Sequence, residues 1–211
     1  MWSGSWATLL AVVALPCLGG PLSGAPIAST AAVARLADRA TSAVRTPKRK
    51  PAFDATFSGK HLNAKTWSTY YPWTSQRGCT NFGNHEEAEW YSPSQVRVSG
   101  GAVHLVAQRK RTVGTTSTGK RKVCGCRSGM ITSYRFKYGF VQVVARIPHA
   151  KGLWPALWLA AVDGKYPPEI DIVESWGVDH ETGSFFHPVT GKRSRAQYSP
   201  ALTRGWQTYS L

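Results

Sequence analysis

Short runs of alternating apolar and polar residues recur along the chain from residue 53 onward. Alternation at 96–98 and 103–107 flanks Gly100-Gly101, and this arrangement predicts a β-hairpin. Strands at roughly ten-residue spacing are typical of a β-sandwich or jelly roll. The pattern therefore predicts an all-β fold and argues against a helical one. Further strands are expected at 130–137, 140–147, 153–162, 170–174 and 206–211.

The predicted strand at 169–174 reads EIDIVE and carries three carboxylates within six residues. Side chains alternate between the two faces of a strand, so Glu169 and Asp171 share a face and Glu174 should point the other way. One extra residue, a β-bulge at Ile172-Val173, restores the parity and brings all three carboxylates to one face. We therefore predict a bulged strand that presents a row of acids.

A row of two glutamates and an aspartate suits glycoside hydrolysis. A retaining glycosidase holds two carboxyl groups about 5–5.5 Å apart, one as nucleophile and the other as acid/base. With the bulge, Glu169 and Glu174 are four strand steps apart, roughly 13 Å between Cα atoms, and their side chains can lean toward each other. Asp171 lies between them and can hydrogen-bond one glutamate. An inverting spacing stays open, as does an amphipathic strand whose acids meet Lys or Arg on neighbouring strands.

Nine tryptophans are more than core packing alone requires in a chain of 211 residues. Alternation along the strand at 153–162 places Trp154, Ala156 and Trp158 on one face. Exposed aromatic rings stack against the apolar faces of pyranose sugars, so such a face beside an acidic strand suits a sugar-binding cleft. The alternative is that these tryptophans fill the sandwich interior.

The N-terminus predicts a secretory signal over residues 1–34. The apolar run at 7–16 is too short to span a bilayer, and small residues follow it up to a cleavage site expected after Ala34. A lipoprotein modified at Cys17 and an uncleaved membrane anchor are the alternatives. We expect an exported protein, extracellular or associated with the cell envelope, that has no stable membrane insertion once the signal is removed.

Residues 35–52 contain six basic residues, one acid and two prolines, which predicts a disordered basic linker. This linker supplies +5 of the net charge of +15, and the folded domain is expected at 53–211. A basic chain raises nucleic acid as a partner. The remaining charges are scattered through turns such as 109–111 and 120–122, however, and no nucleic-acid-binding signature accompanies them. We therefore expect no nucleic-acid partner.

The cysteines outside the predicted signal are Cys79, Cys124 and Cys126, and export permits disulfides. A bridge from Cys79 to either of the other two is expected, with one thiol left over. A direct bond within Cys-x-Cys would be strained. Three cysteines without a histidine at ligand spacing make zinc a weak alternative, and no metal is expected at the acidic strand.

The EIDIVE strand resembles the catalytic signature of glycoside hydrolase family 16, in the bulged E-x-D-x-x-E form that laminarinase-like members carry. The resemblance covers 53–211 and implies a jelly-roll β-sandwich of the concanavalin A-like glucanase type. It places the acids on the concave face and implies a retaining mechanism on β-glucans or galactans. Other segments follow the family's usual order: WSTYYPW at 67–73, NHEEAEWY at 84–91, SGMITS at 128–133, YGFVQVVARI at 138–147 and GLWPALW at 152–158.

The resemblance implies a role for each residue of the row. Glu169 resembles the nucleophile, Glu174 the acid/base and Asp171 the carboxylate that hydrogen-bonds the nucleophile. Trp154 and Trp158 resemble cleft aromatics. The implied protein is a monomeric endo-hydrolase of a polysaccharide, most closely of β-1,3-glucan, without a cofactor, while structural calcium away from the cleft stays open. Weaker cleft-edge candidates are Asn84, Glu87 and His187.

Two other functions stay open, namely a non-catalytic glycan-binding jelly roll and a transglycosylase that uses the same site. The presence of both glutamates argues against the first. Gln207 stands where many relatives have a histidine, in a Trp-His-Thr-Tyr segment. Relatives also continue through several more strands beyond the position of Leu211. The sequence therefore predicts an incomplete catalytic domain that lacks its C-terminal strands.

Overall fold

The computed structural model describes residues 7–14, 50–73, 88–115, 119–148, 150, 152–166, 168–175, 181–186, 193–198 and 205–211. Their regular structure consists of β-strands and the short 3-10 turn η1 (Pro93–Gln95). In these ranges no helix is long and apolar enough to cross a membrane. The predicted all-β fold class is confirmed, because the structure is built almost wholly from strands.

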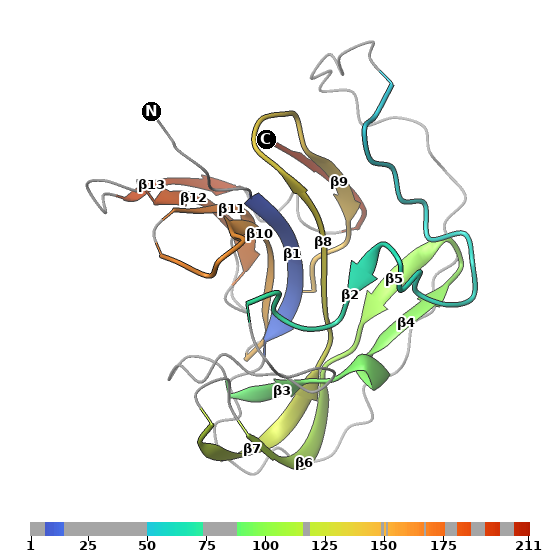
Figure 1. Ribbon diagram of the computed structural model, residues 1–211, viewed down its shortest axis with the longest axis vertical. Helices are drawn as coiled ribbons and strands as arrows, with labels where there is room; N and C mark the ends of the chain where they lie inside the picture. Colours follow the sequence, from blue (N-terminus) through green and yellow to red (C-terminus); the bar gives the residue numbers. More distant parts are fainter. Residues whose placement is uncertain are drawn as a thin grey trace.

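The largest sheet has seven strands, paired antiparallel throughout. Figure 1 shows how its central strands curve past one another across the molecule. In spatial order they are β13 (Arg193–Tyr198), β12 (Glu181–Phe186), β11 (Glu169–Ser175), β10 (Trp154–Ala161), β1 (Ala7–Ala14), β8 (Met130–Phe136) and β2 (Trp67–Ser68).

Three smaller sheets flank this one. The predicted hairpin is confirmed: β4 (Val96–Ser99) and β5 (Ala102–Leu105) pair around Gly100-Gly101. Both glycines have positive φ, +59° and +76°, as a type I′ turn requires. The two-stranded β9–β14 ribbon joins β9 (Gln142–Ala145) to β14 (Gln207–Ser210). The third sheet has the order β3 (Glu89–Tyr91), β7 (Arg121–Ser128), β6 (Gln108–Thr115), with β3 parallel to β7.

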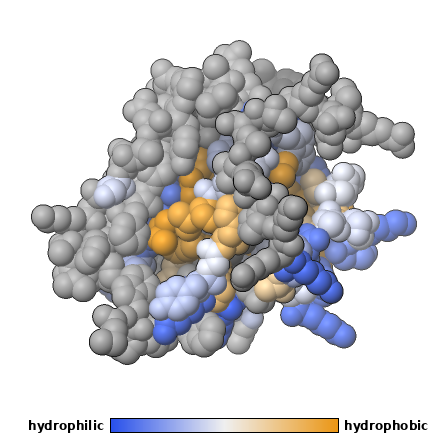
Figure 2. All heavy atoms as spheres, turned by 90° about the horizontal axis from the view of Figure 1, so that it is seen from above, coloured by the Kyte–Doolittle hydropathy of each residue, from blue (hydrophilic) through white to orange (hydrophobic). Residues whose placement is uncertain are grey.

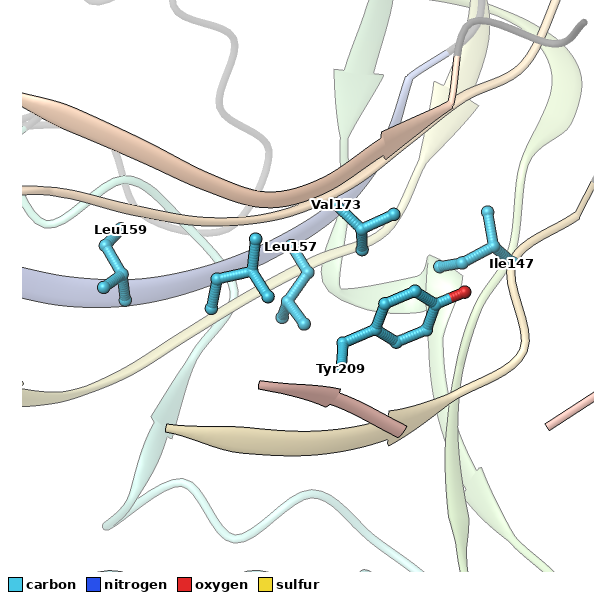
Figure 3. Packing of buried hydrophobic residues seen from close by; sticks show 6 residues of the cluster. Ile147, Leu157, Leu159, Val173 and Tyr209 are labelled. Atoms are coloured by element: carbon cyan, nitrogen blue, oxygen red, sulfur yellow. The ribbon is translucent and has the colours of Figure 1, made fainter. Parts of the chain in front are cut away.

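The main hydrophobic core lies between the large sheet and the β9–β14 ribbon. Leu157 and Leu159 of β10 and Val173 of β11 pack there with Ile147 and Tyr209. Figure 3 shows the ring of Tyr209 beneath Leu157 and Val173, with Ile147 at its hydroxyl end. Two layers with their apolar faces together form a sandwich, in agreement with the expected architecture. From above, apolar side chains gather near the middle of the molecule (Figure 2).

The N-terminal strand differs from expectation. We expected the first fifty or so residues to lie outside the fold, yet Ala7–Ala14 forms β1 in the interior of the large sheet. An uncharged apolar run is the composition of a strand covered on both faces, and it is also the composition of a signal sequence. Whether residues 1–34 act as a signal and 35–52 as a linker therefore stays a prediction.

Candidate active site

The predicted bulge in β11 is confirmed by its pairing with β10. Leu157 of β10 lies opposite Val173, and the next residue, Trp158, lies opposite Asp171. Ile172 therefore has no counterpart on β10 and is the extra residue that defines a bulge. Its side chain packs in the main core, so the extra residue adds apolar contact on the face away from the acids.

The pairing of β11 with β12 shows the same irregularity. Asp171 lies opposite Ser184, and Glu174 lies opposite Thr182. Between these pairs, β11 has two residues, 172 and 173, whereas β12 has only residue 183. Both neighbouring strands thus impose the same shift, and the bulge is fixed from two sides of β11.

The bulge brings the three carboxylates to one face. Residues directly opposite each other in an antiparallel pair share a face, and so do alternate residues of a regular strand. β10 pairs with β1 without interruption along its whole length. The partners of the acids are alternate residues of β10, with Glu169 opposite Ala160, Asp171 opposite Trp158 and Glu174 opposite Ala156.

The same register gives the spacing of the row. The partners of Glu169 and Glu174 are four positions apart on β10, so about 13 Å separates the two glutamate Cα atoms at ~3.3 Å per residue. This agrees with the expected spacing. Glu169 is partly exposed, whereas the solvent-exposed fractions of Asp171 and Glu174 are only 5% and 7%. The row therefore runs from an accessible carboxylate to buried ones.

A tryptophan positions the buried end of the row. The indole Nε1–H of Trp154, at the start of β10, donates a hydrogen bond to Oε1 of Glu174 across 3.0 Å. A donor on one carboxylate oxygen restricts the rotamers of the glutamate and so fixes where its carboxyl group points. Trp154 was predicted as a cleft aromatic from its ring, and its N–H contact was not anticipated.

Aromatic rings cover the sheet beside the acids. Tyr71 packs with Ala156 and Ala160, the β10 partners of the two glutamates, and Trp73 and Trp158 pack against the same cluster. The rings of Tyr71 and Trp73 stack with centroids 5.1 Å apart and planes inclined by 25°. Sequence reasoning did not assign Tyr71 or Trp73 to the site, although the aromatic density of the segment was a usable signal.

Trp73 lies against the turn that follows β10. A Cβ atom added to Gly164 would come within 2.6 Å of Cγ of Trp73, and Gly164 has a φ of +71°. On the same turn, the Lys165 ammonium lies 2.8 Å from the Asp163 carboxylate. This side-chain hydrogen bond lowers the pKa of Asp163 and raises that of Lys165. The turn is thus fitted closely to the indole of Trp73.

Other predicted residues are placed only in part. Cys126 forms a disulfide whose partner lies outside the described residues, and Cys124 is a buried thiol. Across the part of the chain that the structure describes, no group of three or more His, Cys, Asp or Glu could hold a metal ion. The candidates that lie outside the described residues are Asn84, Glu87, His187 and Cys79.

This arrangement has a definite chemical capacity. The glutamates and the aspartate can supply a nucleophile, a proton donor and an assisting carboxylate, and all three point to the same side of the sheet. Partly exposed aromatic rings beside them offer flat apolar surfaces for a sugar. The site is therefore suited to acid/base and nucleophilic chemistry on a glycan chain.

Comparison with known proteins gives a consistent result. The profile described as glycosyl hydrolases family 16 matches residues 82–211, which is more than half of the chain. The endo-1,3-1,4-beta-glycanase EglC of Rhizobium meliloti (strain 1021) is 32% identical over 128 residues, covering 55% of this chain and 27% of the relative. The endo-1,3-1,4-beta-glycanase ExsH of the same organism is 28% identical over 163 residues, covering 69% and 34%.

A third relative is named for binding and not for catalysis. The beta-1,3-glucan-binding protein of Penaeus monodon is 36% identical over 72 residues, which are 32% of this chain and 20% of that protein. The chain thus spans about a third or less of the length of these three relatives. No solved structure matches the chain significantly.

Proposed function

Because the chain belongs to glycosyl hydrolase family 16, we propose that it is a retaining endo-glycosidase that hydrolyses internal β-glycosidic bonds of a polysaccharide. The observation that carries the proposal is the bulge of β11, which places Glu169, Asp171 and Glu174 on one face. Like charges crowded together are costly, so a strand with only a structural role would rarely retain such a row.

The proposed reaction has two displacements. In the first, a carboxylate oxygen of Glu169 attacks the anomeric carbon, while Glu174 gives its proton to the departing glycosidic oxygen. A covalent glycosyl-enzyme forms, and the reducing-end part of the chain leaves. In the second, Glu174 takes a proton from water, and that water displaces Glu169 from the anomeric carbon. Two inversions give net retention of configuration.

The geometry supports this division of roles. The Glu169 and Glu174 Cα atoms are ~13 Å apart, and each glutamate side chain can lean several Å inward to reach the ~5–5.5 Å separation of a retaining pair. Asp171 lies between them on the same face, so in its protonated form it can donate a hydrogen bond to the ionised Glu169 carboxylate. The indole of Trp154 holds Glu174 in one orientation, as an acid that must face the leaving oxygen requires.

The proposed substrate is a β-glucan, with β-1,3 linkages as the first choice. The names of the two Rhizobium meliloti relatives specify 1,3-1,4-β-glycanase activity, and the Penaeus monodon relative is named for β-1,3-glucan binding. The bulged motif, typical of laminarinase-like members, supports the 1,3 linkage. We also propose that the protein acts outside the cell, where polymeric glucan is found, and the disulfide of Cys126 supports this because disulfides persist in oxidising compartments.

The direct test is digestion of laminarin by the purified chain. Release of short oligosaccharides is expected, and the first product observed by NMR should be the β-anomer. Glu169→Gln should abolish release, whereas Asp54→Asn, at an exposed carboxylate outside the site, should leave it unchanged. Failure to cleave laminarin, mixed-linkage β-glucan and galactan would overturn the proposal, and a first product of α configuration would overturn the retaining mechanism.

A second candidate is glycan binding without turnover, which the named role of the Penaeus monodon relative favours. Sedimentation with insoluble β-1,3-glucan separates the two: retention on the glucan with no soluble product identifies binding only. Transglycosylation at the same site is distinguished by its products, because an acceptor sugar in place of water yields oligosaccharides longer than the donor.

A further inference from the structure

The interior strand β1 joins two parts of the large sheet. In the order β13-β12-β11-β10-β1-β8-β2, β10 and β8 are connected only through β1 (Figure 1). All eight residues of β1 pair with β10, from Ala7 opposite Ala161 to Ala14 opposite Trp154. Six of its residues also pair with β8. The space between β8 and β10, here called the β8–β10 slot, is therefore one strand wide.

The walls of the slot are buried. On β8, Met130 and Ile131 retain 0% and 3% of their exposure, and on β10, Leu157 and Leu159 retain 4% and 3%. Backbone N–H and C=O groups at such positions need hydrogen-bond partners, because water cannot reach them once the layers have packed. Without a strand in the slot, each wall would become an unpaired edge, which is a template for pairing with any extended chain.

The composition of β1 matches these walls. Its sequence, ATLLAVVA, contains no charged residue and no proline or glycine. Such a run can occupy a central strand, since every residue keeps its N–H and no charge has to be buried. β1 and β2 are separated by residues 15–66, and a link of that length can extend far beyond the slot. Backbone pairing, and not the covalent link, therefore determines where β1 lies.

We propose that the β8–β10 slot is a strand-acceptor site for Ala7–Ala14, which it holds non-covalently, so that the segment stays bound when the chain is cut between β1 and β2. The slot borders β10, the strand that supplies Trp154 and Trp158 to the candidate active site. An occupied slot keeps β10 an interior strand and so keeps the hydrogen bond from Trp154 to Glu174 in place. The proposal does not depend on the chemistry proposed for that site.

Cutting the intact folded chain tests the proposal. A site for a sequence-specific protease is inserted between Thr41 and Ser42, and the folded protein is cleaved and passed through a size-exclusion column. The N-terminal fragment should co-elute with the remainder and separate only in denaturant. Amide hydrogens of Leu9–Val12 should exchange at least about 100-fold more slowly than in a free peptide of the same sequence. Release of the fragment while β10 and β11 stay protected would overturn the proposal.

A register test excludes non-specific adhesion of an apolar fragment. Ala11 lies directly opposite Leu157, and Cα atoms in such a pair are about 4.5–5.5 Å apart, within the range a disulfide spans. Ala11→Cys with Leu157→Cys should therefore form a bond that retains the fragment under denaturing conditions. The matched control is Ala11→Cys with Ala161→Cys, whose positions differ by four residues, about 13 Å along the strand. Disulfide formation to the same extent in the two double-cysteine variants would overturn the proposal.

A strand-breaking variant supplies an independent readout. Leu10 lies opposite both Trp158 and Thr132, so Leu10→Pro removes a backbone donor between two partner strands. It should unfold at lower denaturant concentration than Leu36→Pro, which makes the same substitution outside the bounds of β1. Equal unfolding midpoints would overturn the proposal, whereas failure of Leu10→Pro alone to fold would support it.

Discussion

Trp154 donates its indole N–H to Oε1 of Glu174 across 3.0 Å, linking the first residue of β10 to the residue that follows the bulge of β11. The two strands are paired so that Trp154 and the Glu174 partner Ala156 are alternate residues on the same face. The contact therefore depends on the bulge, because regular alternation through all six residues of EIDIVE would point Glu174 away from Trp154.

The first prediction concerns this hydrogen bond. Trp154→Phe keeps an aromatic ring but removes the donor, and a typical hydrogen bond contributes about 1 kcal/mol, or roughly a fivefold to tenfold change in rate. We expect kcat on laminarin to fall by about that factor with KM nearly unchanged, because the acid is mispositioned while sugar stacking persists. Trp158→Phe is the matched control. An equal fall in both variants would contradict a specific role for the Trp154 indole.

The second prediction concerns the bulge itself. Deletion of Ile172 removes the extra residue and leaves EIDVE, in which plain alternation keeps Val173 in the core and Glu174 on the face of Glu169 and Asp171. We therefore expect activity on laminarin to persist and the free energy of unfolding to fall by about 2–5 kcal/mol, because the buried side chain of Ile172 is lost from the main core. Urea denaturation measures the stability. Ile172→Val keeps the strand length, so it should cost only about 0.5–1.5 kcal/mol and retain activity.

The third prediction separates the roles of the two glutamates. An aryl glycoside with a good leaving group needs little protonation, so Glu174→Gln should cleave it far better than it cleaves laminarin. Glu169→Gln should cleave neither, because no nucleophile remains. The loss on laminarin should be about 100-fold or more for each variant, which is the usual size of a positioned acid or base. The reverse pattern on the aryl substrate would exchange the two assignments.

The fourth prediction concerns the fit of Trp73 against the turn after β10. Gly164→Ala should place a Cβ atom 2.6 Å from Cγ of Trp73 and also strain a positive φ. Gly119→Ala is the matched control, since Gly119 has a φ of +80° with nothing within 4 Å of the added atom. The control should lose ~1 kcal/mol, and Gly164→Ala should lose about 1–3 kcal/mol more. Urea denaturation of both variants gives the comparison, and equal losses would show that the turn adapts.

A displaced Trp73 should also affect the site. The Tyr71–Trp73 stack lies beside the β10 partners of the glutamates, so Gly164→Ala should raise KM for laminarin more than it lowers kcat. A change in kcat alone would argue that these rings contribute to folding but not to sugar binding.

Several features were predicted correctly because they depend only on residues close together in the chain. Alternation located β10, β11 and β14 to within a residue or two, and two adjacent glycines located the β4–β5 turn. The bulge was predicted because three carboxylates in EIDIVE cannot share a face without it. Resemblance to a family then suggested roles for the carboxylates, and those roles stay predictions.

Other features needed the tertiary structure. The apolar run at the N-terminus was predicted to be a signal, yet in the structure it forms β1 between β8 and β10. Local composition indicates that a segment avoids water, but it does not specify which strands the segment pairs with. The parallel pairing of β3 with β7 was not predicted either, since no local pattern encodes it. The packing of Trp73 against Gly164 was also not predicted, because the two residues are far apart in the sequence.

The sequence by itself determined the faces of the strands, the acidic row and the family, because side-chain periodicity and a short motif are local properties. The tertiary structure decided which strands are neighbours, which ring holds Glu174 and what fills the β8–β10 slot. Those outcomes depend on backbone hydrogen bonds and packing between distant segments, and such contacts are selected by the whole fold and not by the residues adjacent in the chain.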